Sequence, residues 1–225
     1  MPARTCSYHL EMDLSTLAAR VDAVYARSDP ASWPDPHADR EPSEEEYSRM
    51  THPERYAMVA LRAQAWVEVL GSLPGINAEP AVGASLGTGF SGGTRLTSRT
   101  PGTLPLLVLE RAVQDFDDVP AVHVSVDRPE VEIERVPDCG CDACDYGSAN
   151  LVEAFDDTVA DVLNGLVVLQ GDGWRGTWTP DGGGVSGAPG LPELDQVLDW
   201  GGRLFAGESV ALPEGVNALV NARWL

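Results

Sequence analysis

Three closely spaced cysteines are the feature of this chain with the most specific chemistry. Cys139, Cys141 and Cys144 lie in the stretch PDCGCDACD, residues 137–145. Gly140 lacks a side chain and lets the backbone turn the neighbouring thiols toward one point. Zinc prefers four tetrahedral nitrogen or sulfur ligands, and thiolates are among its best. The spacing therefore predicts a zinc site that uses all three cysteines.

The fourth zinc ligand must come from another part of the chain. Residues 122–127 and 130–134 alternate between apolar and polar side chains, which predicts two antiparallel strands. Symmetric pairing of these strands places His123 opposite Glu134, near the end of the hairpin that leads into Cys139. We therefore expect His123 to be the fourth ligand. The alternatives for this position are a water molecule and the side chains of Asp145, Cys6 and His9.

The role of the metal depends on how many protein ligands it has. Four protein ligands make a closed, structural site, whereas three ligands and a water leave a position for catalysis. We favour a structural zinc in a non-catalytic binding or interaction protein, with no catalytic residue. One alternative is a metal-dependent hydrolase that uses Asp142 or Glu134 as its base. A second is a thiol redox protein that uses the pair Cys141 and Cys144.

The composition excludes several classes of partner. The formal charge is -20, from 35 acidic and 15 basic residues. Nucleic-acid affinity depends largely on Lys and Arg, so neither nucleic acid nor an anionic membrane is expected as a partner. No stretch approaches the roughly 18 apolar residues of a membrane span, and residues 1–12 lack the apolar region of a signal peptide. We expect a cytoplasmic protein with reduced thiols, whose protein or small-molecule partner the sequence does not identify.

The elements around the cysteines follow from hydrophobic periodicity. Apolar residues at steps of three and four predict amphipathic helices over 13–27, 53–70 and 151–166, and a last helix over 193–205. Strands are predicted near 94–98, over 104–110, in the hairpin described above, over 166–170 and 174–178, and at 216–225. The Gly-rich remainder of 74–102 and residues 179–192 are predicted loops.

These elements come in blocks and do not alternate regularly between strand and helix. This pattern indicates an α+β fold, with an antiparallel or mixed sheet and three to four packed amphipathic helices. Residues 1–12 are expected to be an N-terminal extension, because Met12 directly precedes the first helix and offers another start codon. Residues 13–225 are expected to form a single α+β domain.

The cysteine stretch and the acidic helix after it resemble an uncharacterised family of actinobacterial proteins marked by a PDCGCDACD-type motif. The resemblance covers much of residues 13–180 and includes these stretches: WPDPH at 33–37, EYSR at 46–49, HPERY at 52–56, TLPLL at 103–107 and the motif itself at 137–149. It implies a bacterial, cytoplasmic setting and no particular reaction.

Overall fold

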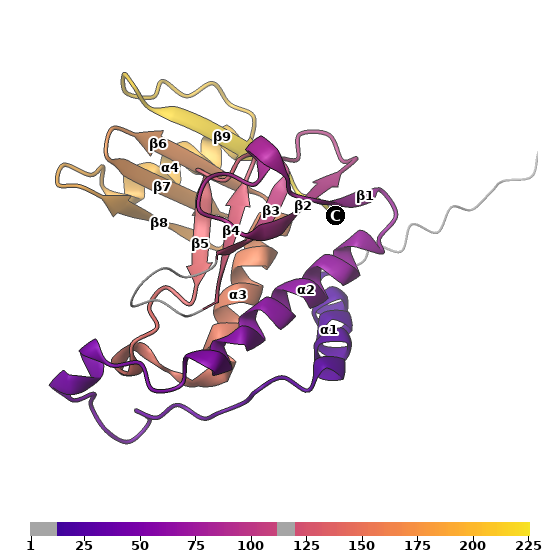
Figure 1. The fold of residues 1–225 in the computed structure, drawn as a ribbon. Coiled ribbons are helices and arrows are strands. Elements are labelled where there is room, and N and C mark those ends of the chain that lie inside the picture. The colour runs from indigo at the N-terminus through magenta and orange to yellow at the C-terminus, as the bar shows by residue number, and fades with distance from the viewer. Residues whose placement is uncertain (1–12, 112–119) are drawn as a thin grey trace, which may run out of the picture.

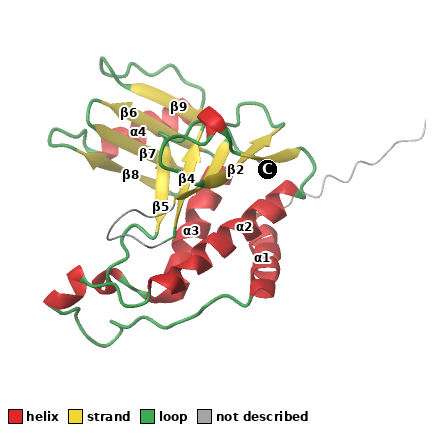
Figure 2. Ribbon diagram, in the orientation of Figure 1, coloured by secondary structure: helices red, strands yellow, loops and turns green. Residues whose placement is uncertain are grey.

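The computed structural model describes residues 13–111 and 120–225, and over these ranges it has an α+β fold (Figures 1 and 2). The α-helices are α1 Leu14–Tyr25, α2 Ala57–Gly71, α3 Gly147–Asn164 and α4 Leu194–Phe205. The short 3-10 helices are η1 Ala26–Ser28, η2 Glu44–Ser48, η3 Pro53–Tyr56, η4 Gly83–Ser85 and η5 Asp142–Cys144. The predicted fold class is confirmed.

The strands form two antiparallel sheets. The first has the order β1 Ile76–Pro80, β2 Gly92–Ser98, β3 Leu106–Arg111, β4 Ala121–Val126 and β5 Glu132–Val136. The second has the order β8 Gly182–Gly187, β7 Trp174–Thr179, β6 Leu166–Gly171 and β9 Asn217–Asn221. Neighbouring strands of the first sheet follow one another in the chain, so β5 is an edge strand. The chain continues from the end of β5 directly into the cysteines.

Helices α2 and α3 pack on one face of the first sheet, and α1 packs against α2 (Figure 1). The predicted helical stripes lie in this core: Leu17 and Val21 of α1, Trp66 of α2 and Phe155 of α3 are at most 2% exposed. Side chains three or four residues apart share a helix face. The stripes of α2 and α3 therefore face the apolar side of the strands, and the stripe of α1 faces α2. The helical predictions from periodicity are confirmed.

The second sheet shares its central strand with this core. Leu166 and Val168 of β6 point into the core of the first sheet, whereas Val167 and Leu169 pack with Val197 of α4 on the other side. A strand buried on both faces is apolar at consecutive positions, as β6 is over residues 166–169. The expectation of one domain over 13–225 stays a prediction.

Two predictions of loop structure were wrong. Strand β1 pairs with β2 at the edge of the first sheet, and β8 pairs with β7 at the edge of the second. Both strands lack the alternation by which strands are predicted, since β1 is mostly exposed and β8 begins with three glycines at 182–184.

The predicted pairing of β4 with β5 was also wrong in register. His123 lies opposite Arg135, not Glu134, and Glu134 lies opposite Val124. Next to the turn the symmetric register holds, since Ser125 lies opposite Glu132. Ile133 of β5 is then an extra residue, as in a β-bulge, and the register is shifted by one beyond it.

Residues 29–56 join α1 to α2 by a long route along the bottom of the molecule (Figure 1). We call this stretch, which contains η2 and η3, the connecting segment. It passes beside the cysteine loop, residues 137–146, which joins β5 to α3.

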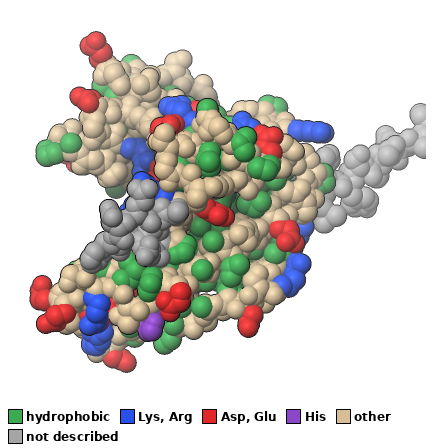
Figure 3. Space-filling model, viewed as in Figure 1, with side chains coloured by type: hydrophobic (Ala, Val, Ile, Leu, Met, Phe, Trp, Pro, Cys, Tyr) green, Lys and Arg blue, Asp and Glu red, His purple; other side chains and the backbone are tan. Residues whose placement is uncertain are grey.

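Two features of the fold relate to the composition of the chain: where the charged side chains lie, and how long and apolar the helices are. Figure 3 shows acidic side chains spread over the face in view and not gathered in one patch. In the two described ranges, no helix is both long and apolar enough to cross a membrane.

Candidate metal centre

The cysteine loop brings the three predicted thiol ligands together. The Sγ atoms of Cys139, Cys141 and Cys144 all lie within 4.8 Å of one another. Cys141 is buried, while Cys139 and Cys144 are exposed. The Sγ atoms of Cys139 and Cys141 are 3.3 Å apart, much farther than the roughly 2 Å of a disulfide, so these are free thiols. One cation could contact all three.

The thiols affect one another's ionisation. Partial burial raises the pKa of Cys144, and the Cys141 and Cys139 thiols raise it further, to about 12. Burial also opposes ionisation of Cys141, but hydrogen bonds from Cys139 and Cys144 outweigh it and lower the pKa of Cys141. At neutral pH the cluster thus retains protons that a metal cation must displace, and metal affinity should rise with pH.

Asp142 joins the cysteine loop to the connecting segment. Its buried carboxylate accepts hydrogen bonds from Arg49 Nε at 2.7 Å, from the Thr51 backbone N–H at 2.8 Å and from Thr51 Oγ1 at 2.5 Å. Its own backbone N–H donates to the Arg49 carbonyl at 2.7 Å. Asp142 is therefore engaged on both its main chain and its side chain.

Asp145 makes a second junction with the same segment. Its side chain is 1% exposed and pairs with the Arg55 guanidinium. Trp33 Nε1 donates to Oδ1 of Asp145 at 2.9 Å, and the Gly147 backbone N–H donates to the same oxygen at 2.9 Å. The Arg55 guanidinium also lies over the Trp33 ring, 4.6 Å from its centroid. A buried carboxylate with this many donors is a structural group and not a free ligand or base.

Close backbone packing completes the junction. Gly147 has φ +85°, and a Cβ at this position would lie 2.7 Å from the Asp35 nitrogen. The Ser148 backbone N–H donates to the Trp33 carbonyl at 3.1 Å, and His37 Nε2 donates to the Asp142 carbonyl at 2.9 Å. These contacts hold the cysteine loop and the start of α3 against the connecting segment.

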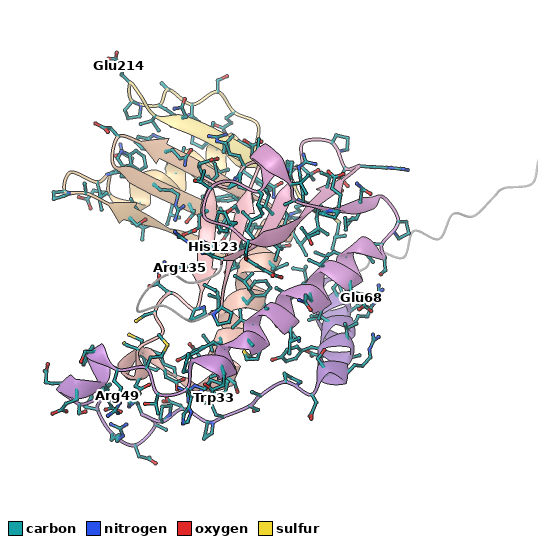
Figure 4. All side chains as sticks on the ribbon, viewed as in Figure 1. Trp33, Arg49, Glu68, His123, Arg135 and Glu214 are labelled. Atoms are coloured by element: carbon teal, nitrogen blue, oxygen red, sulfur yellow. The ribbon has the colours of Figure 1, made fainter. Side chains whose placement is uncertain are left out.

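His123 was predicted to lie beside the cysteines because of a strand register that the structure does not have. It is 2% exposed on β4, its Nδ1 pairs with the Glu132 carboxylate, and its ring meets Phe90 edge-on. Among the described residues, the group that could hold a metal consists of Cys139, Cys141 and Cys144 without His123. Figure 4 shows His123 among the strands, with Arg49 and Trp33 much lower in the view.

The other candidates for the fourth ligand have different outcomes. The Asp145 carboxylate is occupied by Arg55, Trp33 and Gly147, as described above. Cys6 and His9 lie outside the described residues. A water, or a group beyond the described part of the chain, remains for the fourth position of a tetrahedral zinc.

Sequence reasoning missed the side chains that shape the loop. Their polar contacts with Asp142 and Asp145 join residues 90 to 112 positions apart, which no local pattern reveals. The one available signal was the set of stretches at 33–37, 46–49 and 52–56, which contain these side chains: Trp33, Arg49 and Arg55.

The loop and its partners lie inside a recognised family. A model described as a family of unknown function (DUF6226) matches residues 21–198, from within α1 into α4. The chain belongs to the DUF6226 family. No curated protein and no solved structure matches this DUF6226 protein. The expected membership of a family without known function is confirmed. In the DUF6226 chain, β9 lies beyond the matched range and pairs with β6 inside it.

Proposed function

We propose that this protein is a non-catalytic binding protein whose cysteine loop holds a structural zinc through Cys139, Cys141 and Cys144. The observation that carries the proposal is the convergence of three thiols within 4.8 Å in a loop held in shape by other contacts. Thiolates favour zinc over hard cations such as magnesium and calcium. A reducing, cytoplasmic setting, as the resemblance to actinobacterial proteins implies, would keep the thiols available.

The surroundings of the thiols support a structural role over hydrolysis. The hydrolase alternative needs a free general base near the metal. Asp142 is fully engaged by Arg49 and Thr51. Glu134 is an exposed residue of β5, and it accepts a hydrogen bond from the next backbone N–H, that of Arg135, at 3.0 Å. Neither carboxylate is poised to activate a metal-bound water.

The partner of the protein is a protein or a small molecule in this proposal. With a charge of -20, the chain repels nucleic acid and anionic membranes, which supports excluding both.

The structural role is tested by removing the metal under reducing conditions. Chelation should lower the unfolding temperature of the full chain and increase proteolysis within 137–146, because metal binding stabilises only the folded loop. Cys6→Ser and His123→Gln variants then decide the fourth ligand, since only loss of a true ligand weakens retention of zinc against a chelator. An unfolding temperature unchanged by chelation of a zinc-loaded sample would contradict the structural role.

Thiol redox chemistry is the second candidate. The sequence predicted Cys141 and Cys144 as the redox pair, whereas the lowered pKa of Cys141 and its 3.3 Å separation from Cys139 favour the pair Cys139 and Cys141. Redox chemistry predicts a reversible loss of two thiols under mild oxidant in metal-free protein. Zinc-loaded protein that keeps all its thiols under the same oxidant supports the structural zinc.

A further inference from the structure

A second site lies away from the thiols, between α1, α3 and the start of the connecting segment. A cavity of about 880 Å³ opens there, with Met58 and Trp66 of α2 among its lining residues. Small-molecule sites in proteins typically have volumes of about 300–1,000 Å³. The cavity is therefore the right size for one small organic ligand.

The walls of the cavity are mainly apolar. Met58 and Trp66 are each 2% exposed and belong to the main core. Other apolar residues of the wall include Leu14, Ala18, Pro30, Ala31, Val152 and Ala160. Such a surface favours a ligand with an apolar body, because contact removes apolar area from water.

The charged residues around the cavity are all acidic. Glu153, Asp156 and Asp157 of α3 line it, and none of the described lining residues is Lys or Arg. Asp156 is already neutralised, since it accepts hydrogen bonds from Arg62 Nε at 2.8 Å and Trp66 Nε1 at 2.7 Å.

Glu153 and Asp157 have no cationic partner among the described residues. Both are exposed at the rim, one turn apart on the same face of α3. Two adjacent carboxylates beside an apolar cavity attract a positive charge and disfavour an anion.

Tyr25 contributes an unsatisfied polar atom. It lines the cavity, and its hydroxyl is buried without a hydrogen-bond partner among the described residues. Most buried polar atoms in proteins have a partner. A polar group on a ligand could provide one.

We propose that this cavity binds a small organic cation with an apolar body, such as an alkyl amine. Its ammonium group lies at Glu153 and Asp157, and its apolar part covers Met58 and Trp66. The inference rests on the proposed binding function, and it does not depend on zinc.

The test is calorimetric titration of the full chain with octylamine, 1-octanol and octanoate, which share a chain length and differ in charge. Octylamine should bind at one site, about five- to tenfold more tightly than octanol, given the strength of exposed ion pairs. Octanoate should not bind measurably. Equal binding of octylamine and octanoate would overturn the proposal.

Matched variants distinguish binding of octylamine at this cavity from a general attraction of the cation to an acidic protein. Glu153→Gln with Asp157→Asn should reduce octylamine affinity to the level of octanol. Glu44→Gln with Glu45→Gln removes two exposed charges of η2, far along the chain, and should leave the preference unchanged. An equal loss in both pairs would show that only net charge matters, and would overturn the site.

Filling the cavity gives an independent result. Ala160→Trp places a large side chain in the cavity from α3, and Ala18→Trp does so from α1. If one variant does not fold, as judged by circular dichroism, the other is used. Folded variants should lose octylamine binding, and wild-type affinity in them would refute the site. Zinc content measured on the same samples distinguishes the two proposals: binding without zinc contradicts only the metal centre, and zinc without binding contradicts only this cavity.

Discussion

Asp142 and Asp145 lie beside the cysteines in sequence, but their carboxylates bind the connecting segment. Acidic residues next to a predicted metal site suggest charge balance or a catalytic base. Here the carboxylate of Asp142 binds Arg49 and Thr51 instead. The carboxylate of Asp145 binds Arg55 and Trp33. At the scale of single residues, the three thiols form the group that could hold a metal, and the two carboxylates join their loop to the connecting segment.

Replacing Asp145 should therefore destabilise the protein strongly. Asp145→Asn leaves the largely buried Arg55 guanidinium without its ionic partner, and breaking such a pair costs about 3 kcal/mol. The measurement is the free energy of unfolding in urea. Asp138→Asn is the control, because the Asp138 side chain is 83% exposed and its pair with Arg135 contributes about 1 kcal/mol or less. Equal losses in the two variants would contradict this role of Asp145.

Asp142 should make stability depend on pH. Burial raises its pKa, but hydrogen bonds from Thr51 and Arg49 outweigh this and lower the pKa below the ordinary value. The unfolded chain, with a pKa of about 3.9, therefore binds this proton more readily than the folded chain. The stabilisation is present above about pH 4 and is lost as the pH falls through the lower, folded pKa. Urea unfolding from pH 6 to 3 should show a weaker pH dependence for Asp142→Asn than for wild type, and identical slopes would disagree.

At the scale of elements, hydrophobic periodicity predicts helices, but it does not predict the register of strands or the packing of loops. The helices could be predicted because burial repeats along one face. Strands β1 and β8 could not, because one is mostly exposed and the other is glycine-rich. The bulge at Ile133 of β5 places His123 opposite Arg135, and nothing in the alternation of Val131 and Ile133 predicts it.

Replacement of Gly147 tests whether the start of α3 must approach the connecting segment closely. Gly147→Ala combines a positive φ with a contact 2.7 Å from the Asp35 nitrogen. Gly207→Ala is a matched control, with φ +80° and nothing within 4 Å of the added Cβ. The control should cost about 1 kcal/mol from backbone strain alone, and Gly147→Ala should cost clearly more in thermal or urea unfolding. Equal costs would mean that the contact with Asp35 relaxes freely.

For the whole molecule, the sequence indicated which thiols could hold a metal and not which residues surround them. The thiols are neighbours in the chain, so their convergence within 4.8 Å follows from local spacing. The side chains that hold the cysteine loop come from the connecting segment. That segment lies beside the loop because of how the helices pack on the first sheet. The cavity beside α1 and α3 arises in the same way, from elements far apart in sequence.

The most direct test of the metal centre is the zinc content of the full chain, purified under reducing conditions without added metal and measured by elemental analysis. The expected result is one zinc per chain in the wild type and in Asp138→Asn. None is expected when Cys139, Cys141 and Cys144 are all replaced by serine. A folded wild-type protein with fully reduced thiols and no zinc, or a triple variant that retains zinc, would contradict the zinc centre.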